Sequence, residues 1–283
     1  MSNSADDAPT PAARAIQLSR RKVRRFLKIV VVLLAILFLW FTAKICSVVR
    51  EPVVQQASPL LVNDVSQLNQ IHVNEVISPT TTAEIVEAVR LHSGPISIGG
   101  ARHSMGGQIA TEGALFIDMR KFNQILDFSP DNRTITVQAG ARWRDIQERI
   151  DPANLAVKIM QSYANFTIGG SLSVNAHGRY VGLGPLILSV KSIRVVLADG
   201  SLVNAGPTQN ADIFNGVIGG YGGLGVIVEA TLELTDNVKV KRYSRVMAVT
   251  EYKNFFFDQI RGDSRAVFHN GDNDPAPAQC QCH

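Results

Sequence analysis

Three glycines ahead of one apolar segment constrain the fold of this 283-residue sequence more than any other feature. The stretch IGGYGGLGVIVEATLEL, residues 218–234, contains Gly220, Gly222 and Gly225 in the spacing G-x-G-x-x-G. In a Rossmann domain this spacing lies between a strand and a helix, so that a phosphate sits at the helix N-terminus. Here the residues after the glycines are β-branched and alternate apolar with polar, which predicts a strand. Residues 211–217 predict a short helix or turn, so the order is reversed and the Rossmann interpretation fails.

From about residue 63 the chain alternates short strands with helices. Residues 73–78 predict a strand, and Thr81 with Glu84 forms a capping-box pattern that begins a helix. A short buried strand at 96–98 completes a parallel βαβ unit. Mixed parallel and antiparallel strands with few helices predict an α+β domain. Further strands are expected at 114–118, 124–128, 134–140, 155–159 and 226–234, with a helix at 142–150 and a hairpin at 190–206 that turns at Asp199-Gly200.

The charge of the chain is concentrated at its N-terminus. Residues 1–28 carry seven lysines and arginines against two acidic residues, although the whole chain has a net charge of only +4. The remainder is close to neutral and offers no basic stripe for nucleic acid, so no nucleic-acid partner is expected.

An apolar run over residues 26–49 follows the basic cluster. Between Lys28 and Lys44 it is shorter than the roughly 20 residues of a bilayer span, but both lysines can snorkel and apolar residues extend it on each side. We expect a single-pass transmembrane anchor, with residues 1–25 cytoplasmic and the body on the periplasmic or extracellular side. A cleaved export signal is the alternative, since SRRKVRRFLK resembles a twin-arginine signal.

Cysteine usage and the polar C-terminus set further limits. Residues 47–279 contain no cysteine, so neither a disulfide nor a cysteine-type zinc site is expected in the body, and no metal site is predicted. After residue 236 the polarity rises. Residues 237–270 are expected to begin a second, incomplete domain for the substrate, and residues 271–283 to form a disordered tail.

Two more glycine-rich stretches precede the one described first. In IGGARHSMGGQ, residues 98–108, the glycines can adopt positive φ and turn successive N–H groups towards an anion such as pyrophosphate, although a plain tight turn is the alternative. In TIGGSLSVNAHG, residues 167–178, the paired glycines can begin a short helix that faces the same anion. His177 alone is more often a packed or capping histidine than a reactive one. The third stretch would let bare backbone approach a ligand at a sheet edge.

Five stretches in this order resemble the FAD-binding domain of the vanillyl-alcohol-oxidase, or PCMH-type, flavoprotein family over residues 68–234. They are SPTTTAEIVEAV, GGARHSMGGQ, TIGGSLSVNAHG, VVLADGS and ADIFNGVIGGYGGLGVIVEATLEL. The resemblance implies a two-subdomain FAD-binding domain over residues 63–236. GARHS is most similar to sugar-alcohol and aldonolactone oxidases, and HSMGGQ is somewhat similar to cytokinin dehydrogenases.

The resemblance also assigns residues to the cofactor. Gly99 to Gly107 would cradle the pyrophosphate, and His103 falls where many members join FAD covalently. Val226 and Ile227 would touch the nucleotide. A second covalent link, through cysteine, is excluded because residues 47–279 contain none. The implied cofactor-binding residues are Gly99, Gly100, Ala101, Arg102, His103, Ser104, Gly106, Gly107, Gln108, Thr167, Gly169, Gly170, Ser173, His177, Val226 and Ile227.

The implied chemistry is hydride transfer from a hydroxyl-bearing carbon of a sugar, polyol or lactone to the flavin, with oxygen or a quinone as electron acceptor. Ser162 stands where cytokinin dehydrogenases carry an aspartate base, which argues against that substrate. Because the second domain is incomplete, no catalytic acid or base is assigned. The alternatives are a membrane-anchored FAD-binding fragment without turnover and a tethered interaction domain that has lost its cofactor.

Overall fold

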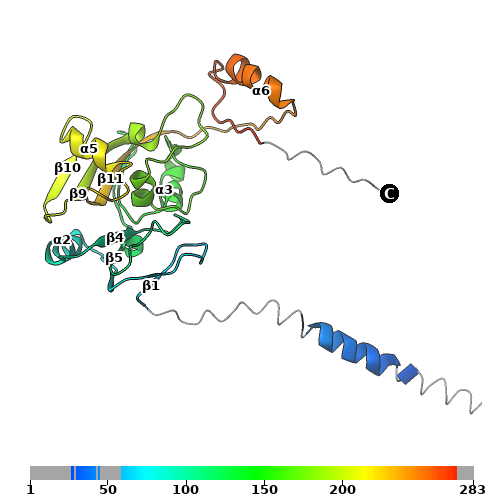
Figure 1. The fold of residues 1–283 in the computed structure, drawn as a ribbon. Helices are drawn as coiled ribbons and strands as arrows, with labels where there is room; N and C mark the ends of the chain where they lie inside the picture. Colours follow the sequence, from blue (N-terminus) through cyan, green and yellow to red (C-terminus); the bar gives the residue numbers. More distant parts are fainter. Residues whose placement is uncertain (1–26, 29, 43, 45–58, 273–283) are drawn as a thin grey trace, which may run out of the picture. The chain divides into compact units, whose positions relative to one another are not determined.

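The protein is described by a computed structural model over residues 27–28, 30–42, 44 and 59–272 (Figure 1). Contacts divide the chain into two units, Met1–Ala57 and Ser58–His283. In the first unit the described residues are helical and their apolar side chains are largely exposed. Among the described residues, no helix combines the length and apolar character that crossing a bilayer requires. The predicted cytoplasmic segment 1–25 and tail residues 273–283 lie outside the described residues.

A three-stranded parallel sheet forms the first part of the second unit. Its order is β3-β5-β4, so β5 runs between two strands that precede it in the sequence and is parallel to both. The predicted helix of the βαβ unit is confirmed as α2, and its capping box joins Thr81 to Glu84. The elements are β1 (Leu61–Val62), β2 (Ile71–His72), β3 (Glu75–Ile77), α2 (Thr82–Leu91), β4 (Ile96–Gly99) and β5 (Leu115–Asp118).

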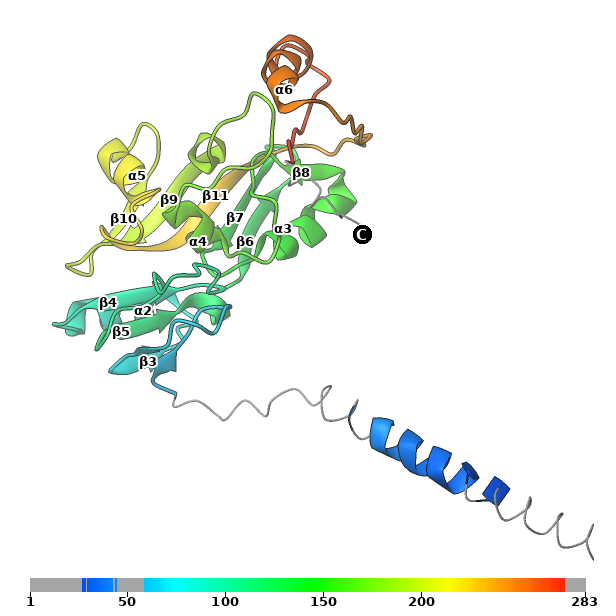
Figure 2. The same cartoon turned by 45° about the vertical axis from the view of Figure 1, so that its right-hand side comes forward.

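A larger antiparallel sheet follows, with the order β10-β9-β11-β7-β6 and with β8 paired to the end of β11 (Figure 2). The predicted hairpin at 190–206 is confirmed, because β9 and β10 pair antiparallel from Val196 with Leu202 onward. Its strands are β6 (Ile125–Ser129), β7 (Thr134–Gln138), β8 (Leu155–Val157), β9 (Val190–Val196), β10 (Leu202–Ala205) and β11 (Val226–Asp236).

Strand β11 lies in the middle of this sheet, between β9 and β7. The glycines before it therefore lead into a central strand of the sheet, not into an outermost one. Gly225 has φ +156°, and a Cβ there would lie 2.5 Å from the Val196 carbonyl oxygen. This glycine allows β11 to approach β9 closely, which is a structural requirement of the sheet itself.

One hydrophobic core extends across both sheets. It includes Ile85 of α2, Ile117 of β5 and Val195 of β9, all buried. Trp143 is fully buried, and its Nε1 donates a hydrogen bond to Ser171 Oγ at 2.9 Å, which joins two helices on one face of the large sheet. The remaining helices of this region are η1 (Met119–Lys121), α3 (Trp143–Ile150), η2 (Asp151–Ala153), α4 (Ile168–Ser173), η3 (Leu186–Ser189) and α5 (Ala211–Val217).

The residues after β11 form a small separate substructure. Residues 237–247 have no regular secondary structure, and helix α6 (Val249–Phe255) continues into the π-helical turn η4 (Phe256–Ile260). An isolated antiparallel bridge joins Phe268 to Tyr180. This region therefore returns to the loop that follows α4.

Candidate cofactor site

The three glycine-rich stretches meet in space. A Cβ on Gly100 would lie 2.1 Å from Thr167 Oγ1, so the first and second stretches are in contact. The Gly219 N–H donates to the Leu172 carbonyl at 2.9 Å and the Tyr221 N–H to the Ser173 carbonyl at 3.0 Å, which joins the second stretch to the third. A Cβ on Gly222 would lie 3.2 Å from Ile98 Cδ1, which joins the third back to the first.

The glycines of loop 98–108 serve two different purposes. Gly106 and Gly107 have positive φ, +148° and +81°, as predicted for these two glycines. Gly99 and Gly100 do not have positive φ, so that part of the prediction is wrong. A side chain at Gly99 would meet Phe116 at 2.1 Å, just as one at Gly100 would meet Thr167, so both are glycine for lack of space.

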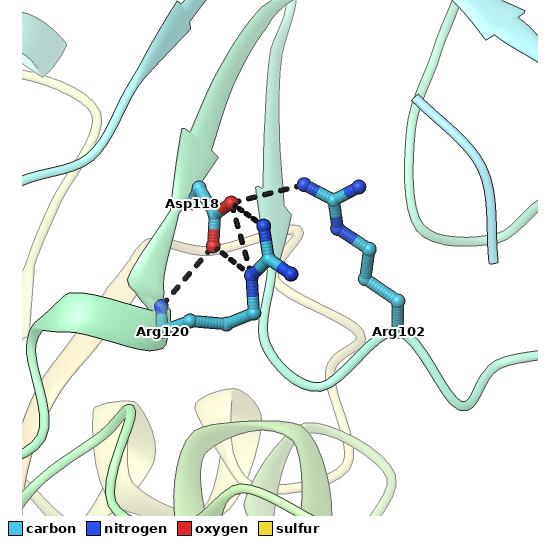
Figure 3. Close-up of polar contacts among 3 residues, drawn as sticks. All are labelled: Arg102, Asp118 and Arg120. Atoms are coloured by element: carbon cyan, nitrogen blue, oxygen red, sulfur yellow. Dashed lines mark hydrogen bonds and ion pairs between the residues drawn. The ribbon is translucent and has the colours of Figure 1, made fainter. Parts of the chain in front are cut away.

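The left-handed position in the first half of the loop is Arg102, with φ +60°. Its Nη2 donates to Asp118 Oδ2 at 2.9 Å, and Arg120 binds the same carboxylate through Nε at 2.8 Å (Figure 3). Burial alone would raise the pKa of Asp118, but the hydrogen bonds and charges of the two arginines more than offset this and lower it. One buried carboxylate therefore holds two guanidinium groups, which leaves a net positive charge beside the loop.

The second half of the loop is held by Asp64, which is buried. Its carboxylate accepts hydrogen bonds from the Ser66 N–H at 2.8 Å, from Asn69 Nδ2 at 2.8 Å and from the Gly106 N–H at 3.2 Å. These bonds, with that of the Ser66 hydroxyl foremost, lower the pKa of Asp64 well below its usual range. The Gly106 N–H, expected to cradle pyrophosphate, is thus directed at a carboxylate of the protein.

His103 packs in an aromatic cluster with Tyr163 and Phe166. Its ring centroid lies 5.2 Å from that of Tyr163 and 4.7 Å from that of Phe166. Burial lowers the pKa of His103, and the nearby Ala101 carbonyl opposes the shift. The lowered pKa favours the neutral ring, and its buried Nδ1 makes no hydrogen bond of normal geometry.

Helix α4 begins at Thr167, whose Oγ1 accepts from the Gly170 N–H at 3.4 Å. The Ile168 and Gly169 N–H groups donate to the Ala141 and Ala139 carbonyls, each at 2.8 Å. The expectation that these amides face an anion is therefore wrong, because the protein itself satisfies them.

The other predicted site residues lie as follows. Ser173 Oγ donates to the Gly169 carbonyl at 2.7 Å, and the side chains of Val226 and Ile227 are buried in the core. The exposed His177 has its Nδ1 3.2 Å from the Gly178 carbonyl oxygen. Ala101 is half-buried, whereas Ser104 and Gln108 are exposed at the rim of the loop.

Unpaired buried polar atoms provide a test of whether this region fits FAD. Five such side-chain atoms are found in the described part of the chain, and four belong to loop 98–108 or to residues 161–165. Buried polar atoms are normally paired, so a concentration of unpaired ones where two loops meet is expected when a polar ligand completes the site. The isoalloxazine, ribityl and diphosphate groups of FAD offer donors and acceptors of both kinds. These atoms are Arg102 Nε, His103 Nδ1, Gln161 Oε1 and Asn165 Oδ1.

Four residues of the site carry no recognisable motif in the sequence. They are Asp64, Asp118, Gln161 and Tyr163, which lie outside the glycine-rich stretches. The one available signal was the position of Asp118 at the carboxyl end of a buried strand, where ligand-facing polar residues gather in parallel sheets.

Comparison with known proteins also indicates an FAD-binding domain. Residues 73–206 match the family described as "FAD binding domain". The chain is 32% identical over 201 residues to an uncharacterized oxidoreductase of the fasciation locus of Rhodococcoides fascians, which covers 68% of this chain and 44% of the relative. It is 28% identical to L-gulonolactone oxidase of Mus musculus, with 55% of this chain and 36% of the relative aligned. It is 29% identical to alditol oxidase of a Streptomyces species, with 60% and 40% aligned.

The chain thus carries an FAD-binding domain of the PCMH-type flavoprotein family, and its cofactor is FAD. The mixed α+β architecture agrees with this assignment. The chain spans less than half the length of each of the three relatives described above.

Proposed function

We propose that this chain is the FAD-binding part of an oxidoreductase that takes a hydride from a hydroxyl-bearing carbon of a sugar, polyol or lactone. The proposal is carried by the meeting of the three glycine-rich stretches, together with four unpaired buried polar atoms in loop 98–108 and in residues 161–165. The names of the mammalian and streptomycete relatives, a lactone oxidase and an alditol oxidase, support the substrate class.

FAD, when bound, supplies the acceptor for the hydride, and the protein supplies its position and surroundings. Arg102, held by Asp118, adds positive charge beside the loop and offers its free Nε–H to an anionic group. In the tautomer of His103 that carries its proton on Nε2, the unpaired Nδ1 has the lone pair that a nucleophile requires.

Covalent attachment of FAD through His103 is part of the proposal. A neutral imidazole is the nucleophilic form, and burial favours that form here. After loading with FAD and acid precipitation, the flavin should stay with the pellet in the wild type and enter the supernatant in His103→Ala. Flavin in the wild-type supernatant would show that attachment is noncovalent.

A membrane anchor over residues 26–49 is a further part of the proposal, with residues 1–25 cytoplasmic and the FAD domain on the opposite side. The basic cluster before the apolar run and the exposure of Leu33, Phe38 and Trp40 support it. Expressed in full, the chain should remain in membranes washed with alkaline carbonate, and a variant that lacks residues 1–49 should be released. Release of the full chain would contradict the anchor.

Turnover with a dye as electron acceptor, across polyols and aldonolactones, tests the function itself. The second candidate is a membrane-anchored FAD-binding fragment without turnover. Flavin reduction by a polyol or lactone under anaerobic conditions supports the enzyme, and bound flavin that no substrate reduces supports the fragment. Repeating productive reactions with oxygen and with a soluble quinone then identifies the acceptor.

A further inference from the structure

A cavity of about 520 Å³ lies beside the loop that follows α4. The first of its lining residues is Gly178, which directly follows His177. Residues 178–184, the loop after α4, form one wall, and the other wall comes from Phe256, Arg261 and His269. Pockets of roughly 300–1,000 Å³ are the size that proteins use for small molecules. This cavity is distinct from the aromatic cluster around His103.

The two walls are joined by backbone pairing. The Val181 N–H donates to the Val267 carbonyl at 3.0 Å, and the His269 N–H donates to the Arg179 carbonyl at 2.9 Å. The rings of Tyr180 and Phe268 pack with their centroids 4.7 Å apart. Segments more than 80 residues apart in the sequence therefore hold the cavity open in a fixed register.

The cavity is lined by two positively charged side chains and by no carboxylate. These side chains are Arg179 and Arg261, and the lining contains neither aspartate nor glutamate. Within the described residues, neither arginine takes part in an ion pair. The Arg261 Cζ lies 5.3 Å from the centroid of the Phe257 ring, and a guanidinium that packs on a ring can still donate hydrogen bonds to a ligand.

The rings in the cavity restrict its occupant further. Tyr252 Oη lies 2.8 Å from His269 Nε2, so the imidazole is held in one orientation. Phe256 and Tyr180 add apolar surface beside the charges. Unpaired planar guanidinium groups next to apolar rings suit a carboxylate on a short carbon chain, because a guanidinium binds the two carboxylate oxygens in parallel.

We propose that this cavity binds the carboxylate of a hydroxy acid, so that the substrate is an anionic sugar derivative rather than a neutral polyol. The inference rests on the proposed function, because Gly178, the first residue of the lining, directly follows His177, which the family resemblance assigns to the flavin site. It narrows the substrate class of the same site to sugar acids and related hydroxy acids.

Gluconate and sorbitol form a matched pair of probes, since both are six-carbon polyhydroxy chains and only gluconate is charged. Binding to the full chain is measured by calorimetry, with and without FAD. We expect gluconate to bind at least about tenfold more tightly than sorbitol, as one charge-assisted hydrogen bond provides. Salt at about 0.5 M should weaken gluconate binding and leave sorbitol binding unchanged.

Arg179→Ala and Arg261→Ala should each weaken gluconate binding about tenfold, whereas Arg242→Ala, at an exposed arginine outside the cavity, should leave it unchanged. Arg179→Lys should restore only part of the affinity, because a lysine lacks the planar fork. The salt dependence of the wild type tests the inference even if an arginine variant fails to fold.

Equal affinity for gluconate and sorbitol, or gluconate binding that ignores salt, would overturn the inference. The inference would also be overturned if inorganic phosphate bound to the cavity as tightly as gluconate, because the cavity would then be a general anion site. FAD binding is followed by flavin fluorescence in the same samples. Failure of FAD to bind would remove the proposed function, while gluconate selectivity in the absence of FAD would still support a carboxylate pocket.

Discussion

Loop 98–108 and segment 161–173 meet at the same site, but different interactions hold them in place. The loop is fixed by charge, since Asp118 binds Arg102 and Asp64 binds the Gly106 N–H. The segment is fixed by packing, through the rings of Tyr163 and Phe166 and through the Trp143 side chain beneath α4. We therefore expect salt and pH to change the stability of the loop, and the loss of buried side chains to change the stability of the segment.

Trp143→Ala should have the largest effect. The indole is fully buried and supports Ser171 of α4, so its removal leaves a cavity beneath the packed segment. The free energy of unfolding should fall by about 3–5 kcal/mol. Urea denaturation measures it, and the loss should be the same at low and high salt. A loss that depends strongly on salt would break the distinction between the two regions.

Gly100→Ala tests the point where the two regions touch. A methyl group there would lie 2.1 Å from Thr167 Oγ1, so the loop and α4 must separate. The free energy of unfolding should fall by about 1–3 kcal/mol, and FAD should bind more weakly. Gly262→Ala is the matched control, because nothing lies within 4 Å of the added atom. Normal FAD affinity in Gly100→Ala would show that the contact is not needed for the site.

Asp118→Asn should act on the charged loop alone, and more weakly. It removes the charge that pairs with Arg102 and Arg120, but Arg120 is half-exposed, so we expect a loss of about 1 kcal/mol with a several-fold weaker affinity for FAD. Because the folded pKa of Asp118 lies below its ordinary value, the stabilisation is present above about pH 4 and is lost as the pH falls through the folded pKa.

Urea denaturation of both proteins between about pH 7 and pH 3 measures this difference. The wild type should be more stable than Asp118→Asn at the upper end, and the two should converge at the lower end. A gap that stays constant over the whole range would rule out Asp118 as the titrating group.

The smallest effect is expected at His103. Burial lowers the pKa of His103, so Tyr163→Ala, which opens the aromatic cluster, should move that pKa up towards the ordinary value, and Tyr163→Phe should not. In the wild type the corresponding stabilisation is present above about pH 6.5 and declines as the pH falls through the folded pKa. An NMR titration of the imidazole protons measures the pKa of His103 in the wild type and in both variants. An unchanged pKa in Tyr163→Ala would exclude the cluster as the cause.

The sequence allowed the architecture to be predicted, because strand periodicity and turn residues are local signals. The meeting of the three stretches was implied by the resemblance to the flavoprotein family. The sequence did not reveal why individual residues are glycine. Gly99 and Gly100 depend on Phe116 and Thr167, neighbours only in the folded chain. Asp64 was missed for the same reason, since its partner Gly106 lies 42 residues away.

The central claim is that one FAD molecule occupies the place where the three stretches meet. Amide chemical shifts of ¹⁵N-labelled protein, recorded during a titration with FAD, test it most directly. We expect saturable shifts that appear together at Gly100 to His103, at Tyr163 to Ser173 and at Gly222 to Val226. Shifts confined to one of these segments, or no saturable change at all, would contradict the claim.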